Sequence, residues 1–591
     1  ALTQITVTTM RTRSSELSLL LCAVLVFFSQ ACTNLLVSRG ASTDDSNIIA
    51  YNADAANFYT TIYHYPAGQH DNGTLRKTYS WDYGTFLGEI PEAAETYNVV
   101  GNVNEHGLVI TESTFGGLLE LACSRRTGLI DYGSLIWITL QRAASAREAI
   151  STMAWLVETY GYASTGESFS IADPEELWVM ELIGKGQHAK GAVWVARRVP
   201  EGHVTGHANQ ARITTFPLDS PDDCLYAPDT VSFAQSLGLY PADQPAEVFS
   251  FSDTYDPITF EGARFCEARV WSFLGAVMGR DWAQQYLDYA QGYNLTNRMP
   301  LFVKPSQPLS PQDVMQAMRN HYEGTALDGT GTLFPDVGAA QYSDPNRKSP
   351  TEWHASGSPG RTFFNERNIA QAPTGWSIVC QARPNVPRQM AALLWFGIDD
   401  SSTSVHWPLY GSTTRIPESW AGGGPQDGVT PPLMQFSFDS SFYVFNLVAN
   451  FVYSRWDLIY ADVHEAILRK EAGYFDLVAQ TDAKALAMFE SPEHSDADVV
   501  EFLTSFSFEL GTALTRDWLT YFGELFVKFR DGYVTTAGAA PVCGCQTASA
   551  PYQDDWYNRI VEDTGDFYLV PPADEAALRR TTRKTDLRAF N

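Results

Sequence analysis

The feature that most constrains this chain is a short apolar run that ends directly at a cysteine. Two arginines precede the apolar stretch of residues 17–28, and Ser29 and Ala31 then occupy the small-residue positions that a signal peptidase prefers. The stretch is shorter than the roughly 20 apolar residues that cross a membrane as a helix. The pattern therefore predicts a secretory leader over residues 1–31, so that the folded chain begins at Cys32.

Other interpretations of this boundary stay open. A bacterial lipoprotein signal also ends at a cysteine, but Ser29 stands where that signal prefers a leucine-like residue. The ordinary alternative is that Cys32 is simply a first cysteine destined for a disulfide. Either signal peptidase or self-cleavage by Cys32 could remove the leader, and the lack of a gap between the apolar run and Cys32 favours the peptidase. Met10 is the only methionine in this leader, so the residues before it are a candidate gene-model artefact.

The charge of the chain excludes one large class of partners. The formal net charge is −28 at pH 7, which repels phosphate backbones and anionic lipid, so we expect neither a nucleic-acid partner nor a membrane association of the mature form. Asn72 and Asn294 each begin a glycosylation sequon, which is meaningful in a eukaryotic host. Together with the leader, these features predict a secreted, extracellular protein or one in a lysosome-like compartment.

Cysteine usage agrees with export. Six cysteines follow Cys32 in the mature chain, and in an oxidising compartment they could form up to three disulfides. This would leave Cys32 as the odd thiol. The six are Cys123, Cys224, Cys266, Cys380, Cys543 and Cys545.

The first part of the chain has the patterns of strands. Runs rich in β-branched and aromatic residues are separated by polar turns. They predict hairpins from 34–38 with 47–53 and from 97–103 with 107–113, and further strands at 169–173, 176–182 and 191–197. Helical spacing of apolar residues over 134–161, with Ser145 and Glu148 as a capping box inside it, predicts two helices between these strands.

The second part of the chain is mainly helical. Residues 214–260 and 320–375 are rich in proline, aspartate, glycine and serine, and we interpret them as excursions. Aromatic-rich periodic segments over 439–531 predict helices, and the composition after 535 is typical of a loop. The expected fold class is α+β. The expected division is a leader at 1–31, one large domain at 32–530 and a loop-like tail at 531–591.

An N-terminal cysteine has a specific chemistry. A thiol with a pKa near 8.5 and an α-amine with a pKa near 8 lie on the same residue, so the free amine can accept the thiol proton. Processing before Cys32 would then be activation. The sequence has no zinc helix, because "HEAIL" at 464–468 lacks a second histidine four residues on. We therefore expect no metal and no cofactor.

Five segments in order carry a family resemblance. They are Cys32-Thr33, "NIIAYNAD", "GNVNEHGLVITESTFGG" (101–117), "FSIADPEELWVMEL" (169–182) and "HANQARI" (207–213). In order and spacing the chain resembles, over about 32–530, the C69 dipeptidases, which are N-terminal-nucleophile hydrolases related to choloylglycine and penicillin V acylases. The resemblance implies a four-layer αββα sandwich with a helical C-terminal region, and hydrolysis of dipeptides by a cysteine freed by processing.

The resemblance also implies roles for five residues. Cys32 would be the nucleophile and, through its amine, the base, while Asp54 would hold that amine. Asn104 would offer an oxyanion donor through its backbone N–H, and Asn209 one through its side-chain amide. Arg264 would steady the site and is the loosest match. Taken singly, these residues also fit ordinary structural roles: Asp54 as a turn residue, Asn104 as a hairpin residue and Asn209 as a strand-end cap.

One position departs from the family pattern. Many relatives have Arg-Asn-x-Asp where this chain has "YNAD", so Tyr51 replaces an arginine near the nucleophile. The expected activity is a cysteine dipeptidase that acts on small peptides through an acyl-enzyme. The alternatives are an N-acyl amide amidase of the acylase type and, from another class, a catalytically idle binding or structural glycoprotein. Side-chain preference and oligomeric state stay open.

Overall fold

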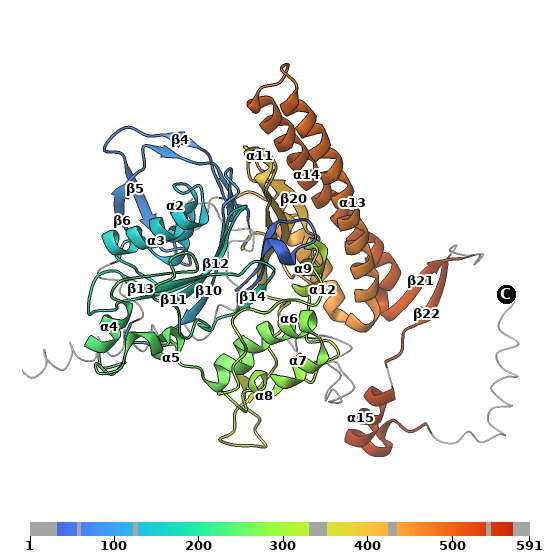
Figure 1. The fold of residues 1–591 in the computed structure, drawn as a ribbon. Helices are drawn as coiled ribbons and strands as arrows, with labels where there is room; N and C mark the ends of the chain where they lie inside the picture. The colour runs from blue at the N-terminus through green and yellow to red at the C-terminus, as the bar shows by residue number, and fades with distance from the viewer. Residues whose placement is uncertain are drawn as a thin grey trace, which may run out of the picture.

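Two antiparallel sheets form the centre of the fold, and helices lie on either side of them (Figure 1). The computed structural model describes residues 32–55, 61–121, 128–329, 345, 352–422, 434–538, 545–552 and 554–570. The predicted leader therefore lies outside the described residues. The mixed helix and sheet architecture confirms the predicted α+β class.

The first sheet has six strands and contains the start of the described chain. β1 (Thr33–Val37) pairs with β2 (Asn47–Asp54) as the predicted hairpin, with Thr33 opposite Asn52. The sheet order is β14 (Val204–His207), β1, β2, β18 (Thr374–Ala382), β19 (Ala392–Ile398) and β20 (Trp407–Tyr410). The two central strands β1 and β2 thus come from the N-terminus, while their neighbours come from distant parts of the chain.

The second sheet has eight strands. The predicted strands at 169–173, 176–182 and 191–197 are confirmed as parts of an antiparallel series. The order is β15 (Cys224–Tyr226), β13 (Ala192–Arg198), β12 (Leu177–Gly184), β11 (Gly166–Ala172), β10 (Val109–Gly116), β9 (Val103–Asn104), β8 (Val99–Val100) and β3 (His64–Tyr65). The predicted second hairpin corresponds to β8, β9 and β10.

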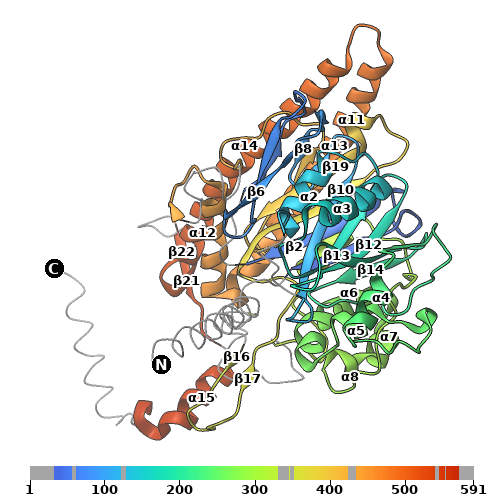
Figure 2. The same cartoon turned by 90° about the vertical axis from the view of Figure 1, so that its left-hand side faces the viewer.

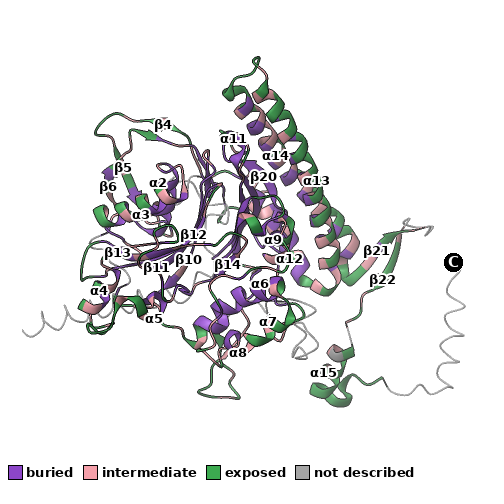
Figure 3. Cartoon of the chain, in the orientation of Figure 1, coloured by how far each residue is buried: buried purple, intermediate pink, exposed green. Residues whose placement is uncertain are grey.

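The two sheets pack against each other through β1 and β2 on one side and β10 and β11 on the other. Helices α2 (Tyr132–Leu140) and α3 (Ala146–Tyr160) lie on the eight-stranded sheet, on the side that Figure 2 brings to the front. Helices contacting the six-stranded sheet include α6 (Ala268–Met278), α9 (Pro311–Ala317), α12 (Ser441–Ser454) and α14 (Asp496–Phe529). The strands are buried throughout the centre (Figure 3).

Burial on both faces explains the composition of the central strands. A sheet covered on both sides has near-continuous apolar runs instead of an alternation of apolar and polar residues. β1 and β2 are buried at every position, and their sequences "TNLLV" and "NIIAYNAD" are apolar at most of them. The polar residues that do occur in these strands must therefore have partners inside the protein.

The helical C-terminal region is confirmed. α13 (Trp456–Glu490) and α14 form a long hairpin whose outer half is mostly exposed (Figure 3). The inner part of α14 lies on β20, where Gly511 meets the ring of Trp407: a Cβ at this glycine would fall 2.6 Å from the ring. Among the described residues, no helix is long and apolar enough to cross a membrane.

Two expectations about the chain need correction. The tail after 530 is not only loop, because β21 (Tyr533–Ala537) pairs with β22 (Cys545–Ser549) and α15 spans Asp554–Thr564. "YVTTA" is rich in β-branched residues, which favours this pairing although the segment next to it is typical of a loop. The predicted excursions also contain short elements: β15, α4 (Thr230–Ser236), α5 (Phe251–Tyr255), β16 (Glu352–Trp353) and β17 (Phe363–Phe364).

Cysteine pairing is more limited than the three disulfides that the sequence allowed. Cys224, Cys266 and Cys380 are free thiols, each buried in a different element: β15, the π-helical segment Gly262–Glu267 and β18. Cys545 is disulfide-bonded. The two remaining cysteines of the predicted six lie outside the described residues.

Candidate active site

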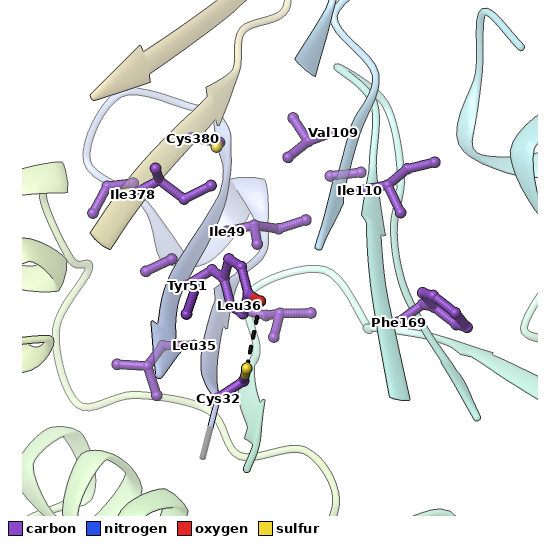
Figure 4. Packing of buried hydrophobic residues seen from close by; sticks show 14 of the residues in the cluster. Cys32, Leu35, Leu36, Ile49, Tyr51, Val109, Ile110, Phe169, Ile378 and Cys380 are labelled. Atoms are coloured by element: carbon purple, nitrogen blue, oxygen red, sulfur yellow. Dashed lines mark hydrogen bonds between the residues drawn. The ribbon is translucent and has the colours of Figure 1, made fainter. Parts of the chain in front are cut away.

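Cys32 lies at the point where the chain enters the six-stranded sheet. Its side chain is fully buried, at 0% exposure, and its Sγ lies 3.4 Å from the hydroxyl oxygen of Tyr51 on the neighbouring strand β2 (Figure 4). The Tyr51 hydroxyl donates its hydrogen to Oε1 of Glu112 at 2.7 Å. Glu112 belongs to β10, so a hydrogen-bonded chain runs from the thiol in one sheet to a carboxylate in the other.

The surroundings of Cys32 keep its thiol protonated. Burial raises the pKa of the thiol well above its usual range, and the nearby carboxylates of Glu112 and Asp54 raise it further. The hydrogen bond with Tyr51 and the backbone amide of Asp54 act in the opposite direction. A nucleophile at this position therefore needs a base close by.

Asp54 ends β2 beside the thiol, as the sequence predicts. Its carboxylate accepts hydrogen bonds from Oγ1 of Thr374 at 2.5 Å and from Nε2 of Gln371 at 3.3 Å. Burial raises its pKa to about 7, although the Thr374 hydrogen bond and the charges of Arg269 and Arg367 lower it. A buried carboxylate in this state is suited to hold a cationic group against the start of β1.

Two arginines near the thiol come from parts of the chain far from "YNAD". Arg269 lies in α6, and Arg367 lies in the segment before β18; both influence the pKa of Asp54. Burial and the charge of Arg269 lower the pKa of Arg367 to about 10, although the charge of Asp54 acts in the opposite direction. The positive charges near Cys32 thus belong to residues that follow it by more than 200 positions in the chain.

Arg269, and not the predicted Arg264, contacts the nucleophile residue. Its Nη1 donates to the backbone oxygen of Cys32 at 2.9 Å and to Oγ1 of Thr33 at 2.8 Å. Its Nη2 donates to Oδ1 of Asn209 at 2.8 Å. This one buried guanidinium therefore links the start of β1 to the loop that carries Asn209.

Arg264 takes a different position. It pairs with Glu366 and lies 5.3 Å from the centre of the Phe364 ring. The two arginines are five residues apart, which on an α-helix places them roughly 140° apart around the axis. The segment Gly262–Glu267 is instead a π-helix, a local widening that occurs often near functional sites. "ARFCEAR" contains both arginines, and this change of helical pitch is what the sequence pattern could not supply.

Asn209 is linked to Cys32, the predicted nucleophile, through Arg269. Its φ of 65° is in the left-handed region, which asparagine tolerates better than most residues, and this turns its side chain toward Arg269. Its Nδ2 donates to the backbone oxygen of Thr114 at 2.6 Å. An amide nitrogen carries two hydrogens, and this hydrogen bond uses one of them.

Buried polar groups hold the Asn209 loop in place. Glu181 accepts the backbone N–H of Arg212 at 2.5 Å and that of Ile213 at 3.1 Å. His207 lies between Oγ of Ser113 at 2.6 Å and Oγ of Ser170 at 2.7 Å. Burial lowers the pKa of His207 to about 3, so this histidine stays neutral and acts as a fixed spacer between the sheets.

The structure does not bring Asn104 to the nucleophile. Its backbone N–H donates to the oxygen of Leu108, and its Nδ2 donates to the oxygens of Leu140 and Ala143, both at 2.8 Å. Asn104 also lies beyond the Val109 end of β10, opposite Leu108, which is four residues or about 13 Å along the strand from Glu112. Its amide groups are engaged in shaping the turn before β10, so the geometry gives no support to an oxyanion role.

Sequence reasoning missed two acidic residues of the site. Glu112 and Glu167 lie on the adjacent strands β10 and β11 and are both buried, at 2% and 0% exposure. Burial raises the pKa of both, to about 7 for Glu112, and the charge of Glu112 raises that of Glu167 further. The sequence does contain a pattern that could have indicated these two residues. "ITES" and "GESF" each place a charged glutamate inside an otherwise strand-like run.

The two sequons lie at turns. Asn72 is exposed between β4 (Gly68–Gln69) and β5 (Leu75–Tyr79). Asn294 is half-buried after α8 (Leu287–Ala290), where its Nδ2 donates to Asp288 at 2.8 Å. Glycosylation of either residue stays a prediction.

Comparisons with known proteins point to one family. The model of "Peptidase family C69" matches residues 31–469. A probable dipeptidase of Salmonella dublin is 26% identical over 404 residues, covering 64% of this chain and 81% of its own. A probable dipeptidase of Latilactobacillus sakei is 23% identical over 505 residues, covering 82% and 92%. Dipeptidase A of Lactobacillus helveticus is 25% identical over 286 residues, covering 48% and 51%.

The chain was also compared with solved structures. A penicillin V acylase from Agrobacterium tumefaciens superposes with a TM-score of 0.26 at 10% sequence identity, covering 68% of this chain and 94% of that one. This likeness is too distant to inform the site.

Proposed function

The chain belongs to peptidase family C69, and from this premise we propose that it is a dipeptidase whose nucleophile is Cys32, freed as the N-terminal residue. The curated relatives named above are dipeptidases or probable dipeptidases, which supports this substrate class. The observation that carries the proposal is the Arg269 bridge, which holds the carbonyl oxygen of Cys32 and the side chain of Asn209 in one arrangement.

The free amine of Cys32 is the proposed base. While another residue precedes Cys32, its nitrogen is an amide and has no basic lone pair. Once freed, the amine takes the thiol proton, and the thiolate attacks the scissile carbonyl carbon. The carbon–nitrogen bond breaks as the proton passes to the leaving amine, and the C-terminal amino acid departs. Water then cleaves the thioester and releases the N-terminal amino acid.

Three further residues have proposed roles in this reaction. Asp54 holds and orients the amine, since its buried carboxylate lies beside the thiol. Asn209 donates its remaining N–H to the tetrahedral oxyanion, which is the group whose charge develops in the transition state. Arg269 is a positioning residue for both Cys32 and Asn209.

The surroundings of the enzyme are part of the proposal. The two sheets with helices beside each are consistent with the four-layer αββα sandwich of N-terminal-nucleophile hydrolases, and we propose that architecture here. The apolar run before Cys32 supports secretion, into the medium or into a lysosome-like compartment. In such a compartment, Asn72 and Asn294 would be candidates for glycosylation.

Activity and mass together test the proposal. The secreted protein should begin at residue 32 and should hydrolyse dipeptides faster than N-acylated amides, and Cys32→Ala should abolish turnover. An intact mass for Cys32→Ala that still starts at residue 32 assigns the cut to signal peptidase, whereas extra residues assign it to Cys32 itself. Normal peptidase activity of Cys32→Ala would end the nucleophile assignment, and faster cleavage of N-acylated amides would replace the dipeptidase by an amidase.

A further inference from the structure

Two buried glutamates next to the nucleophile each have one carboxylate oxygen without a partner. Oε1 of Glu112 accepts the Tyr51 hydroxyl at 2.7 Å, and Oε1 of Glu167 accepts from Oγ1 of Thr114 at 3.1 Å and Oγ of Ser164 at 3.5 Å. The Oε2 atoms of both glutamates are buried and have no hydrogen-bond partner. Each carboxylate is thus held by one oxygen, and the two carboxyl groups also interact with each other, as a pair that shares one proton does.

Such a pair requires a positive charge or a proton. A buried carboxylate without a counter-charge is strongly unfavourable, and two neighbouring ones in the same site cannot both ionise easily. In the part of the chain that the structure describes, Glu112 and Glu167 form no ion pair with a lysine, arginine or histidine. The charge that balances them in the working enzyme must therefore be a proton or come from outside the chain.

The position of the pair relative to the thiol limits what that charge can be. Oε1 of Glu112 is separated from Sγ of Cys32 by two consecutive hydrogen bonds through Tyr51. In a peptide, the α-nitrogen is two bonds from the carbonyl carbon of its own residue, about 2.5 Å away. A carbonyl carbon poised about 3 to 3.5 Å from the sulfur can therefore place the α-nitrogen of the same residue about as far from the sulfur as the Glu112 carboxylate is, on the side of the glutamate pair.

We propose that Glu112 and Glu167 bind the α-ammonium group of the substrate's first residue, so that this enzyme takes peptides with a free amino terminus. The inference rests on the proposed dipeptidase function and names the group that this site recognises. An ammonium group has three N–H donors, enough for the two free Oε2 atoms with one to spare. When a peptide binds, its ammonium group replaces the proton that Glu112 and Glu167 hold in the site without substrate.

This assignment explains a choice between substrate classes. An N-acylated amide has no ammonium group, so it would leave two carboxylates buried without a counter-charge or would keep a proton there. A site built for a charged donor rejects analogues that lack it far more strongly than it rejects small changes in shape. Recognition of the ammonium at the first residue also fixes the scissile bond as the one directly after that residue.

A substrate series on the processed wild-type enzyme tests the inference. The series is alanyl-alanine, its Nα-acetyl derivative and its desamino analogue, in which hydrogen replaces the ammonium group. We expect kcat/KM to fall by at least about a hundredfold from the first to either of the others. Equal kcat/KM for alanyl-alanine and the desamino analogue would overturn the inference and leave the dipeptidase assignment standing. Failure to cleave alanyl-alanine or any other free dipeptide would overturn the dipeptidase assignment itself.

A variant of Glu167 tests whether this residue is responsible for the preference for a free amino terminus. Glu167→Gln should lower kcat/KM for alanyl-alanine by about ten- to a thousandfold, mainly through KM, and should change the desamino analogue little. The matched control is Glu176→Gln, at the opposite end of the same hairpin, where Glu176 pairs with Arg147 at 2.8 Å. The control should keep the wild-type preference, and full retention of that preference by folded Glu167→Gln would refute the assignment. If Glu167→Gln does not fold, the wild-type series decides alone.

Discussion

Replacing Arg269 by lysine tests whether one side chain holds the nucleophile and the oxyanion donor together. The arginine side chain is fully buried, and its planar group offers five N–H donors. Its acceptors are the backbone oxygens of Phe265, Cys32 and Ala208 and the side-chain oxygens of Thr33 and Asn209. A lysine keeps the charge but has only three donors at one point. At least two of the five buried acceptors must then lose their partner.

The expected magnitude follows from these acceptors. A buried acceptor without a partner costs about 1 to 3 kcal/mol, so Arg269→Lys should lower the free energy of unfolding by about 2 to 6 kcal/mol. In a chain of 591 residues, 1 kcal/mol shifts the melting temperature by about 1 °C, and thermal unfolding should move down by about 2 to 6 °C. A displacement of Cys32 or Asn209 by about 1 Å should lower kcat about a hundredfold, with a smaller change in KM.

Arg264→Lys is the matched control. Arg264 lies five residues earlier, is 8% exposed and pairs with Glu366. A lysine can keep this charge pair, so kcat should stay within about threefold of wild type. Steady-state kinetics on a dipeptide and thermal unfolding of both variants decide the question. If Arg269→Lys keeps the wild-type kcat while Arg264→Lys loses it, the reasoning from the guanidinium contacts is refuted.

Three further predictions follow from single contacts. Tyr51→Phe should lower kcat about tenfold, because it removes the hydrogen-bonded link between the Cys32 thiol and Glu112; an unchanged kcat would contradict this. His207 has a folded pKa of about 3, below its unfolded value near 6.5. Its contribution to the free energy of unfolding is therefore full above pH 6.5 and is lost as the pH falls toward 3. The loss amounts to up to about 5 kcal/mol. Unfolding measured between pH 7 and 4 should therefore be less pH-dependent for His207→Gln than for wild type, and equal slopes would refute the point. Gly511→Ala should lower the melting temperature, because the new Cβ would fall 2.6 Å from the Trp407 ring. This clash should outweigh the roughly 1 kcal/mol by which alanine favours a helix over glycine. A rise in the melting temperature would show that the ring moves aside.

The strands and helices could be predicted because their signals are local. "NLLVS" with "NIIAYNA" formed the expected hairpin, since apolar β-branched runs around a polar turn favour pairing wherever they lie in the chain. Ser145 caps α3 as expected, with its hydroxyl accepting the N–H of Glu148. The disulfides could not be predicted in this way, because a cysteine count carries no information on how far apart the thiols lie in the core.

The residues of the candidate site also divide into those that local sequence signals place and those that only packing places. The placement of Cys32 before a strand and of Asp54 at the end of the next could be expected, because both belong to one hairpin whose register follows from adjacent residues. Asn209 also reached the nucleophile, through the pairing of β14 with β1. Asn104 did not, because its hydrogen bonds within the turn engage the groups that the pattern suggested were free.

The sequence alone determined the hairpin of β1 and β2 beside Cys32 and the family to which the chain belongs. Only the tertiary structure decided which arginine contacts the nucleophile, because a π-helical turn precedes Arg269 and no residue pattern encodes that pitch. The same holds for Glu112 and Glu167, which acquire their role from burial between two packed sheets. Charge, burial and distance between remote strands are properties of packing, and the order of residues specifies them only through the completed fold.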